Sequence, residues 1–279
     1  MGEFAVRLGL NFTPPHSSPE DWAEKLYQKG VRATAFPLDY HAPVSQIDAY
    51  VQAAKERDIL IAEVGIWNSP HHTDPRERSL AQEACLEQLR LADYVNARCA
   101  VNVSGAAGPV WYGCYRDNYS QAVYAENVAF IQFLCDEAKP RNTYYTLEVM
   151  QWMLPDSPEQ YARFLQDVDR ERFAVHMDAV NFVKDPYLCT HHNEVIDKAF
   201  RLLGPKIRSC HLKDFRLKDA TSLMVEEVIP GTGMLDIPHY LACVGRLDPD
   251  MPVLLEHLSG EAEYDEALAR VRSVCSLSR

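Results

Sequence analysis

Three carboxylates and one imidazole stand at the ends of short apolar runs in the second half of the chain: Glu148, Asp178, His211 and Glu256. An isolated charge in apolar surroundings costs several kcal/mol to bury, so each of these side chains needs a partner. If the four meet, they can share a divalent cation, and this donor set suits Mn²⁺, Mg²⁺, Co²⁺ or Fe²⁺ better than a thiolate-rich zinc site does. The alternative is four separate polar residues at strand ends, held by loop amides.

Eight runs rich in β-branched and aromatic residues recur along the chain, each followed by a helical pattern: residues 6–11, 31–36, 60–66, 99–104, 143–150, 173–181, 207–214 and 252–258. Their spacing of about 35 residues fits a strand, a helix and two loops. The pattern predicts an α/β fold, a (β/α)8 TIM barrel, and we expect one domain over residues 1–279. In such a barrel the carboxyl ends of the strands meet at one face, where the four residues would share an axis.

Several connecting segments have recognisable features. Three helices are predicted to begin at a capping residue followed by proline: Ser18-Pro19, Asp74-Pro75 and Ser157-Pro158. Residues 105–119 and 215–235 look irregular, and both follow predicted strands, so we expect them on the functional face. The second contains Pro-Gly-Thr-Gly at 230–233. We expect a tight turn there rather than an anion-binding nest, since the established phosphate-binding motifs are absent.

Composition narrows the classes of partner. The chain has 28 Lys and Arg against 40 Asp and Glu, a net charge of −12, which disfavours nucleic acid and anionic membranes. No apolar run approaches the ~18 residues of a membrane span, and residues 1–11 lack the features of a secretory signal, so we expect a cytoplasmic protein. Most of the eight cysteines are expected to be free and buried. The sequence leaves open whether the chain forms a homo-oligomer.

Further motifs are similar to those of the sugar phosphate isomerase/epimerase family, whose xylose isomerase-like TIM barrels include ketose 3-epimerases and inosose dehydratases. The matching stretches span nearly the whole chain: residues 153–158, 175–181, 211–214, 230–236 and 255–258. The resemblance implies that Glu148, Asp178, His211 and Glu256 hold one divalent ion. Mn²⁺ is the expected ion, and Mg²⁺, Co²⁺, Fe²⁺ or Zn²⁺ are alternatives. It also implies that Glu148 and Glu256 are catalytic and move protons.

The resemblance implies a metal-dependent isomerase or epimerase that acts on a sugar or keto-sugar through an enediol. The chemistry asks for the same groups independently, because removing a proton next to a carbonyl requires an electrophile at the oxygen and a base beside the carbon. The closest alternative is a lyase or dehydratase that uses the same site on a keto-sugar, keto-inositol or C-glycoside. The net charge and the single histidine ligand disfavour a DNA-cleaving barrel, and the complete ligand set disfavours a non-catalytic binding protein.

Four polar residues are expected to contact the substrate. His176 and Lys213 share a face with Asp178 and His211, because side chains two positions apart on a strand point the same way. The alternatives are a core histidine at 176 and a structural ion pair at 213. Asn181 stands where ketose 3-epimerases carry a sugar-binding histidine. Arg216, just past the strand, could clamp a carboxylate or phosphate, or be a solvated loop arginine.

Aromatic residues near other strand ends, Trp67 and Trp111 among them, are expected to form apolar walls against a sugar, with core or loop packing as the alternative. Glu63, inside the third strand, is expected to make a structural ion pair. Three carboxylates around one divalent cation leave the centre near −1, and Asp214 lies nearby, so we expect an unphosphorylated substrate.

Overall fold

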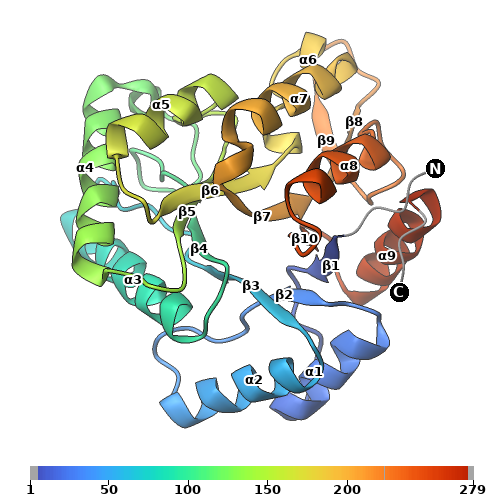
Figure 1. Ribbon diagram of the computed structural model, residues 1–279. Helices are drawn as coiled ribbons and strands as arrows, with labels where there is room; N and C mark the ends of the chain where they lie inside the picture. Colours follow the sequence, from blue (N-terminus) through green and yellow to red (C-terminus); the bar gives the residue numbers. More distant parts are fainter. Residues whose placement is uncertain (1–5, 223, 276–279) are drawn as a thin grey trace.

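The computed structural model describes residues 6–222 and 224–275, and over this range eight parallel strands close into a barrel (Figure 1). Around the barrel the order is β1-β10-β7-β6-β5-β4-β3-β2. The strands are β1 (Arg7–Leu10), β2 (Ala33–Ala35), β3 (Leu60–Gly65), β4 (Cys99–Asn102), β5 (Tyr145–Glu148), β6 (Phe173–Asp178), β7 (Ile207–Leu212) and β10 (Pro252–Leu255). Each lies within one of the eight predicted runs, and the predicted barrel is confirmed.

Helices follow the strands and surround the barrel (Figure 1). They are α1 (Pro19–Gln28), α2 (Val44–Glu56), α3 (Pro75–Tyr94), α4 (Gln121–Ala138), α5 (Pro158–Val168), α6 (Pro186–Thr190), α7 (His192–Leu203), α8 (Ile237–Leu247) and α9 (Glu261–Cys275). The three predicted helix starts are confirmed. The side chains of Ser18, Asp74 and Ser157 each accept hydrogen bonds from backbone N–H groups of the first turn, which would otherwise have no partner.

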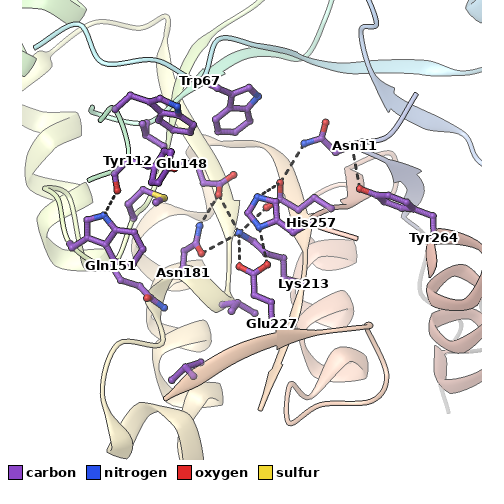
Figure 2. A pocket seen from close by; sticks show the side chains of 17 residues that line it. Asn11, Trp67, Tyr112, Glu148, Gln151, Asn181, Lys213, Glu227, His257 and Tyr264 are labelled. Atoms are coloured by element: carbon purple, nitrogen blue, oxygen red, sulfur yellow. Dashed lines mark hydrogen bonds and ion pairs between the residues drawn. The ribbon is translucent and has the colours of Figure 1, made fainter. Parts of the chain in front are cut away.

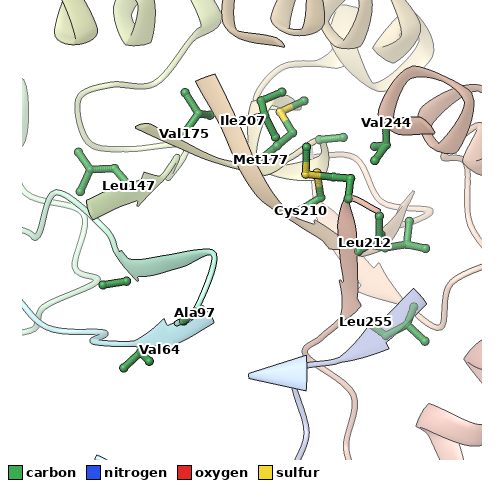
Figure 3. Packing of buried hydrophobic residues seen from close by; sticks show 14 of the residues in the cluster. Val64, Ala97, Leu147, Val175, Met177, Ile207, Cys210, Leu212, Val244 and Leu255 are labelled. Atoms are coloured by element: carbon green, nitrogen blue, oxygen red, sulfur yellow. The ribbon is translucent and has the colours of Figure 1, made fainter. Parts of the chain in front are cut away.

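Alternation along the strands separates an apolar layer from a polar interior. Leu147, Met177, Leu212 and Leu255 belong to the buried apolar cluster that also includes Val244 of α8 (Figure 3). Their neighbours in the sequence have the opposite direction, because successive side chains of a strand point to opposite faces. The carboxylates at 148, 178 and 256 directly follow Leu147, Met177 and Leu255, so they face the barrel interior.

A two-stranded antiparallel hairpin, β8 (Asp214–Leu217) with β9 (Val225–Val228), occupies part of the segment expected to be irregular. The Pro-Gly-Thr-Gly segment packs against its base. The carboxylate of Asp214 accepts hydrogen bonds from the backbone N–H groups of Gly231, Gly233 and Leu235, at 2.8–2.9 Å. A β-carbon at Gly233 would lie 2.3 Å from Asp214 Oδ1, so this approach requires glycine. The turn therefore binds an internal carboxylate.

The cysteines agree with the expectation from composition. Among the described side chains, Cys114 is exposed and six other cysteines are free and buried; the side chain of Cys275 lies outside the described part. No helix in the described ranges combines the length and the apolar character needed to cross a membrane.

Candidate metal centre and substrate cavity

The four predicted ligands come together at the carboxyl end of the barrel. Glu148 and Asp178 are the last residues of β5 and β6, His211 lies on β7, and Glu256 directly follows β10. The register pairs Asp178 directly with His211, whereas Glu148 pairs with His176, and Glu256 lies two residues beyond Leu254, the partner of His211. Each is at most 4% exposed, and one donor atom from each lies within 4.8 Å of the others.

Each carboxylate uses one oxygen for a hydrogen bond and leaves the other without one. Glu148 Oε1 accepts from Asn181 Nδ2 at 2.7 Å, Asp178 Oδ1 from the backbone N–H of Val180 at 2.8 Å, and Glu256 Oε2 from Asn11 Nδ2 at 3.4 Å. The second oxygens, Glu148 Oε2, Asp178 Oδ2 and Glu256 Oε1, are buried and have no hydrogen-bond partner in the described structure.

The two ring nitrogens of His211 also have different surroundings. Its Nε2 contacts Glu63 Oε1 at 3.1 Å, whereas its Nδ1 has no hydrogen-bond partner among the described residues and lies 2.7 Å from Glu148 Oε2 and 2.9 Å from Glu256 Oε1. These four atoms make close charged contacts with one another and with Lys213 but no aligned hydrogen bond, so they converge on one point where a cation could replace those contacts. Three oxygens and one imidazole nitrogen fit a divalent cation of the Mg²⁺ to Zn²⁺ series.

Glu63 of β3 supports this centre from below. Its carboxylate is fully buried and contacts two imidazoles, those of His211 and His176, the latter at 2.9 Å. Burial raises the pKa of Glu63, but the charges and hydrogen bonds of the two histidines outweigh it and lower the pKa to about 2. A carboxylate on Nε2 fixes the ring so that Nδ1 faces the centre, the usual support of a metal-binding histidine. The expected ion pair of Glu63 is present.

Lys213 supplies positive charge to two of the carboxylate oxygens that make no aligned hydrogen bond. Its Nζ lies 2.9 Å from Asp178 Oδ2 and 2.8 Å from Glu256 Oε1, and it donates to Asn181 Oδ1 at 3.2 Å. Burial lowers the pKa of Lys213, but the surrounding carboxylates, Asp178 first, raise it well above its ordinary value. Burial raises the pKa of Asp178 to about 6 in spite of Lys213, with further contributions from Glu148 and Glu256. The centre thus holds more negative charge than one lysine balances.

A cavity of about 810 Å³ opens above the centre. Figure 2 shows Glu148, Asn181 and Lys213 grouped at its polar side, with Trp67 and Tyr112 nearby. Trp111 and Trp152 also line it, and the indole of Trp152 donates to the carbonyl of Tyr112 at 2.8 Å. Flat apolar walls beside a charged floor suit a ligand with C–H faces and hydroxyl edges.

Comparisons with known proteins agree with this architecture. The model of the family described as xylose isomerase-like TIM barrel matches residues 12–274. The chain belongs to this family. No curated protein matches the chain.

Solved structures with the same barrel include three of particular interest. A xylose isomerase-like TIM barrel protein from Mycobacterium smegmatis in complex with magnesium is 15% identical, with a TM-score of 0.68 over 99% of this chain and 98% of that one. A probable 3-DHS dehydratase from Bacillus anthracis is 17% identical, with a TM-score of 0.72 over 98% of both chains. A D-psicose 3-epimerase from Clostridium cellulolyticum H10, with D-tagatose, is 12% identical, with a TM-score of 0.68 over 97% and 98%. At these identities the likeness shows the fold.

The xylose isomerase-like barrel brings some predicted substrate-binding residues to the cavity and not others. Asn181, Lys213, Trp67 and Trp111 line it. His176 lies beneath the centre, is 1% exposed and is not among the lining residues. Arg216 is also not on the cavity: it is exposed on β8 and pairs with Glu226, because side chains alternate along the hairpin.

Among the lining residues that were not predicted, Glu227 of β9 and His257 are the two that can carry charge. His257 Nδ1 contacts Glu227 Oε2 at 2.8 Å, and Glu227 Oε1 lies 3.7 Å from Lys213 Nζ. The hydrogen bond to Glu227 raises the pKa of His257. For Glu227 the sequence offers only the four-residue run Val-Glu-Glu-Val at 225–228, which lacks strict alternation and does not indicate that the segment folds back on the barrel mouth.

Proposed function

We propose that this xylose isomerase-like barrel is a divalent-metal-dependent isomerase or epimerase of a sugar or keto-sugar, with Glu148, Asp178, His211 and Glu256 as the metal ligands. The observation that carries the proposal is the convergence of four buried donor atoms, none of them in an aligned hydrogen bond, at the floor of an aromatic-walled cavity. The epimerase among the similar structures, and the one in complex with magnesium, support the same reading.

In the proposed reaction, one glutamate acts as the base and the other as the acid. Glu148 and Glu256 come from β5 and β10, with β6 and β7 between them in the barrel wall, so they approach a shared ligand from different sides. A bound divalent ion would polarise the substrate carbonyl and so acidify the adjacent C–H. One glutamate, as the carboxylate, removes that proton to give an enediol. The other, protonated from solvent, delivers its proton to the opposite face or to the neighbouring carbon, and the first then releases its proton to solvent.

Other residues position the substrate and the glutamates. Asn181 holds Glu148 through Oε1, which leaves Oε2 directed to the centre. The Lys213 ammonium lies where it can donate to a substrate hydroxyl or carbonyl oxygen while balancing the carboxylates. The indole of Trp67 lies over the His211 ring, with centroids 6.2 Å apart, and helps to exclude water from the floor.

Deuterium labelling tests the reaction type. The metal-loaded enzyme is incubated in deuterated water with a panel of ketohexoses, ketopentoses and keto-glycosides, and products are analysed by mass spectrometry and NMR. We expect an isomer or epimer that carries deuterium on a carbon next to the carbonyl, since the proton passes through a side chain. A product lighter by one water, or loss of an aglycone, would instead assign the site to a lyase.

Charge around the cavity predicts a preference for substrates without phosphate. Among the described lining residues, Lys213 is the only lysine or arginine, and it already faces carboxylates. The Pro-Gly-Thr-Gly turn binds Asp214 instead of a free anion. Repulsion of about 1–2 kcal/mol between a phosphate and the floor corresponds to about a tenfold lower kcat/KM.

The measurement compares one sugar with and without its terminal phosphate at low and high salt. High salt should reduce the difference in kcat/KM between the two sugars, because screening weakens the repulsion between the phosphate and the floor. A tenfold preference for the phosphorylated sugar, lost in Lys213→Ala, would show that the lysine is a phosphate site and that the charge argument is wrong.

A further inference from the structure

A second group of metal-binding side chains lies outside the barrel, between α7 and α8. His239 and Cys243 are one helical turn apart on α8, so they share a face, and Asp197 comes from α7, which packs against it. Asp197 Oδ1 is 2.8 Å from His239 Nε2, and Cys243 Sγ is 3.8 Å from each of these two atoms. Three donor atoms of different chemistry therefore form one small triangle.

The arrangement does not fit a nucleophile activated by a histidine. In such a relay the carboxylate contacts one ring nitrogen and the nucleophile contacts the other. Here Asp197 and Cys243 both approach Nε2 of His239. A shared point for one oxygen, one nitrogen and one sulfur is instead the arrangement of ligands around a metal. Around a tetrahedral Zn²⁺, with bonds of 2.0–2.3 Å, such donors are about 3.3–3.6 Å apart. The two sulfur separations, 3.8 Å each, are slightly longer than this, and the Asp197–His239 pair, hydrogen-bonded at 2.8 Å, would separate by about half an ångström to admit the ion.

The triangle is buried on the side of Cys243 and open to solvent on the side of Asp197 and His239. Cys243 is 2% exposed, whereas the side chains of His239 and Asp197 are 29% and 55% exposed, so solvent reaches the open side. Arg246 Nη2 donates to Cys243 Sγ at 3.0 Å, and hydrogen bonds of this kind support thiolate ligands. Burial raises the pKa of the Cys243 thiol and Arg246 opposes that rise; coordination itself deprotonates a thiol.

We propose that Asp197, His239 and Cys243 bind a thiophilic divalent cation, Zn²⁺, with water as the fourth ligand. The site is independent of the barrel centre, and its ion joins α7 to α8. The two sites differ in preference, because a thiolate favours Zn²⁺ over Mn²⁺ or Mg²⁺, while the barrel centre offers no sulfur.

Cobalt spectroscopy separates the two sites. Thiolate ligation of Co²⁺ gives an intense charge-transfer band in the near ultraviolet, whereas oxygen and nitrogen ligands do not. Reduced, metal-free full-length protein titrated with Co²⁺ should show this band with a final intensity of one thiolate-bound Co²⁺ per chain, although the barrel centre can take a second Co²⁺. The band should disappear when Zn²⁺ is added, since Zn²⁺ binds more tightly. Cys243→Ser should abolish the band. His239→Gln and Asp197→Asn should weaken the apparent Co²⁺ affinity at least ~10-fold, as loss of a ligand does.

Two matched controls complete the design. Cys114→Ser removes the exposed cysteine of the described part of the chain, and Asp178→Asn alters the barrel centre; both should keep the band. His239→Gln changes a half-buried residue, so it serves if Cys243→Ser does not fold. Absence of the band in the wild type, its persistence in Cys243→Ser, unchanged affinity in His239→Gln, or its loss in Cys114→Ser would each overturn the proposal.

Discussion

Glu148→Gln and Glu256→Gln should each lower turnover at least ~100-fold while the barrel stays folded, because general acid–base catalysis typically contributes 10²–10⁴. Glutamine keeps the size of the side chain and an oxygen that accepts a hydrogen bond, so Asn181 can still hold residue 148 and Asn11 residue 256. What glutamine removes is the ability to accept a proton. Each variant should therefore lose exchange of substrate hydrogen with solvent as well as net turnover.

The matched control is Glu226→Gln. Glu226 is next to the cavity residue Glu227, but its side chain pairs with Arg216 and does not line the cavity. This variant should retain wild-type turnover. Circular dichroism and thermal melting check folding in all three, and metal content is measured in parallel, since a glutamine also makes a weaker ligand. If both site variants exchanged hydrogen at near-normal rates with metal bound, the two-glutamate mechanism would be wrong and Lys213 would become the candidate base.

The barrel and its centre were predictable because both depend on local patterns. The strands are short apolar runs at even spacing, and the alternation of side chains decides which residues face inward. Glu148, Asp178 and Glu256 each follow a buried leucine or methionine, so the sequence itself gives their direction once the strands are recognised. The parallel order then brings the ends of β5, β6, β7 and β10 to the same face.

The contacts around the centre were less accessible to prediction because they depend on long-range register. Glu63 was expected in an ion pair, but its partners are 113 and 148 positions away in the sequence, on β6 and β7. The side chain of His176 points into the barrel as predicted. It lies two residues before Asp178 on β6, so it is below the four candidate ligands and does not line the cavity. Register of this kind is set by the closure of the whole barrel.

The hairpin β8–β9 shows the same limit. In its register Arg216 pairs with Glu226 and Phe215 pairs with Glu227, so Arg216 and Glu227 lie on opposite faces of the hairpin and only Glu227 reaches the cavity. Which side chains of a two-stranded hairpin face the barrel depends on the twist of the hairpin and on how it packs against the barrel. A four-residue run reveals neither. The Asp214 carboxylate holds the base of the hairpin by accepting hydrogen bonds from the backbone N–H groups of Gly231 and Gly233. In the sequence these two glycines were compatible with either a tight turn or an anion-binding nest.

Removal of the barrel ligands should abolish binding of one Mn²⁺ per chain. His211→Ala deletes the nitrogen donor, and Asp178→Asn replaces a charged oxygen donor while Oδ1 can still accept from the backbone of Val180. Mn²⁺ is the probe of choice, because the oxygen-rich centre suits it and the proposed thiolate site between α7 and α8 does not. Equilibrium dialysis or paramagnetic resonance gives the stoichiometry. His191→Gln, an exposed histidine stacked on Tyr187, is the matched control and should bind like the wild type.

Metal binding should also appear in the stability of the wild type. An ion that binds only the folded state adds about 2.7 kcal/mol when its concentration is 100 times its Kd, which for a chain of this size raises Tm by roughly 5–10 °C. In protein stripped of all metal and reloaded with Mn²⁺ alone, chelation should remove that increment in the wild type and in His191→Gln, and should have no effect on Asp178→Asn, because the thiolate site between α7 and α8 does not favour Mn²⁺. The centre carries unbalanced negative charge without a cation, so the metal-free wild type should also gain more stability from Mn²⁺ than Asp178→Asn does. Unchanged Mn²⁺ stoichiometry in both ligand variants would show that the four residues are a buried polar network and not a metal centre.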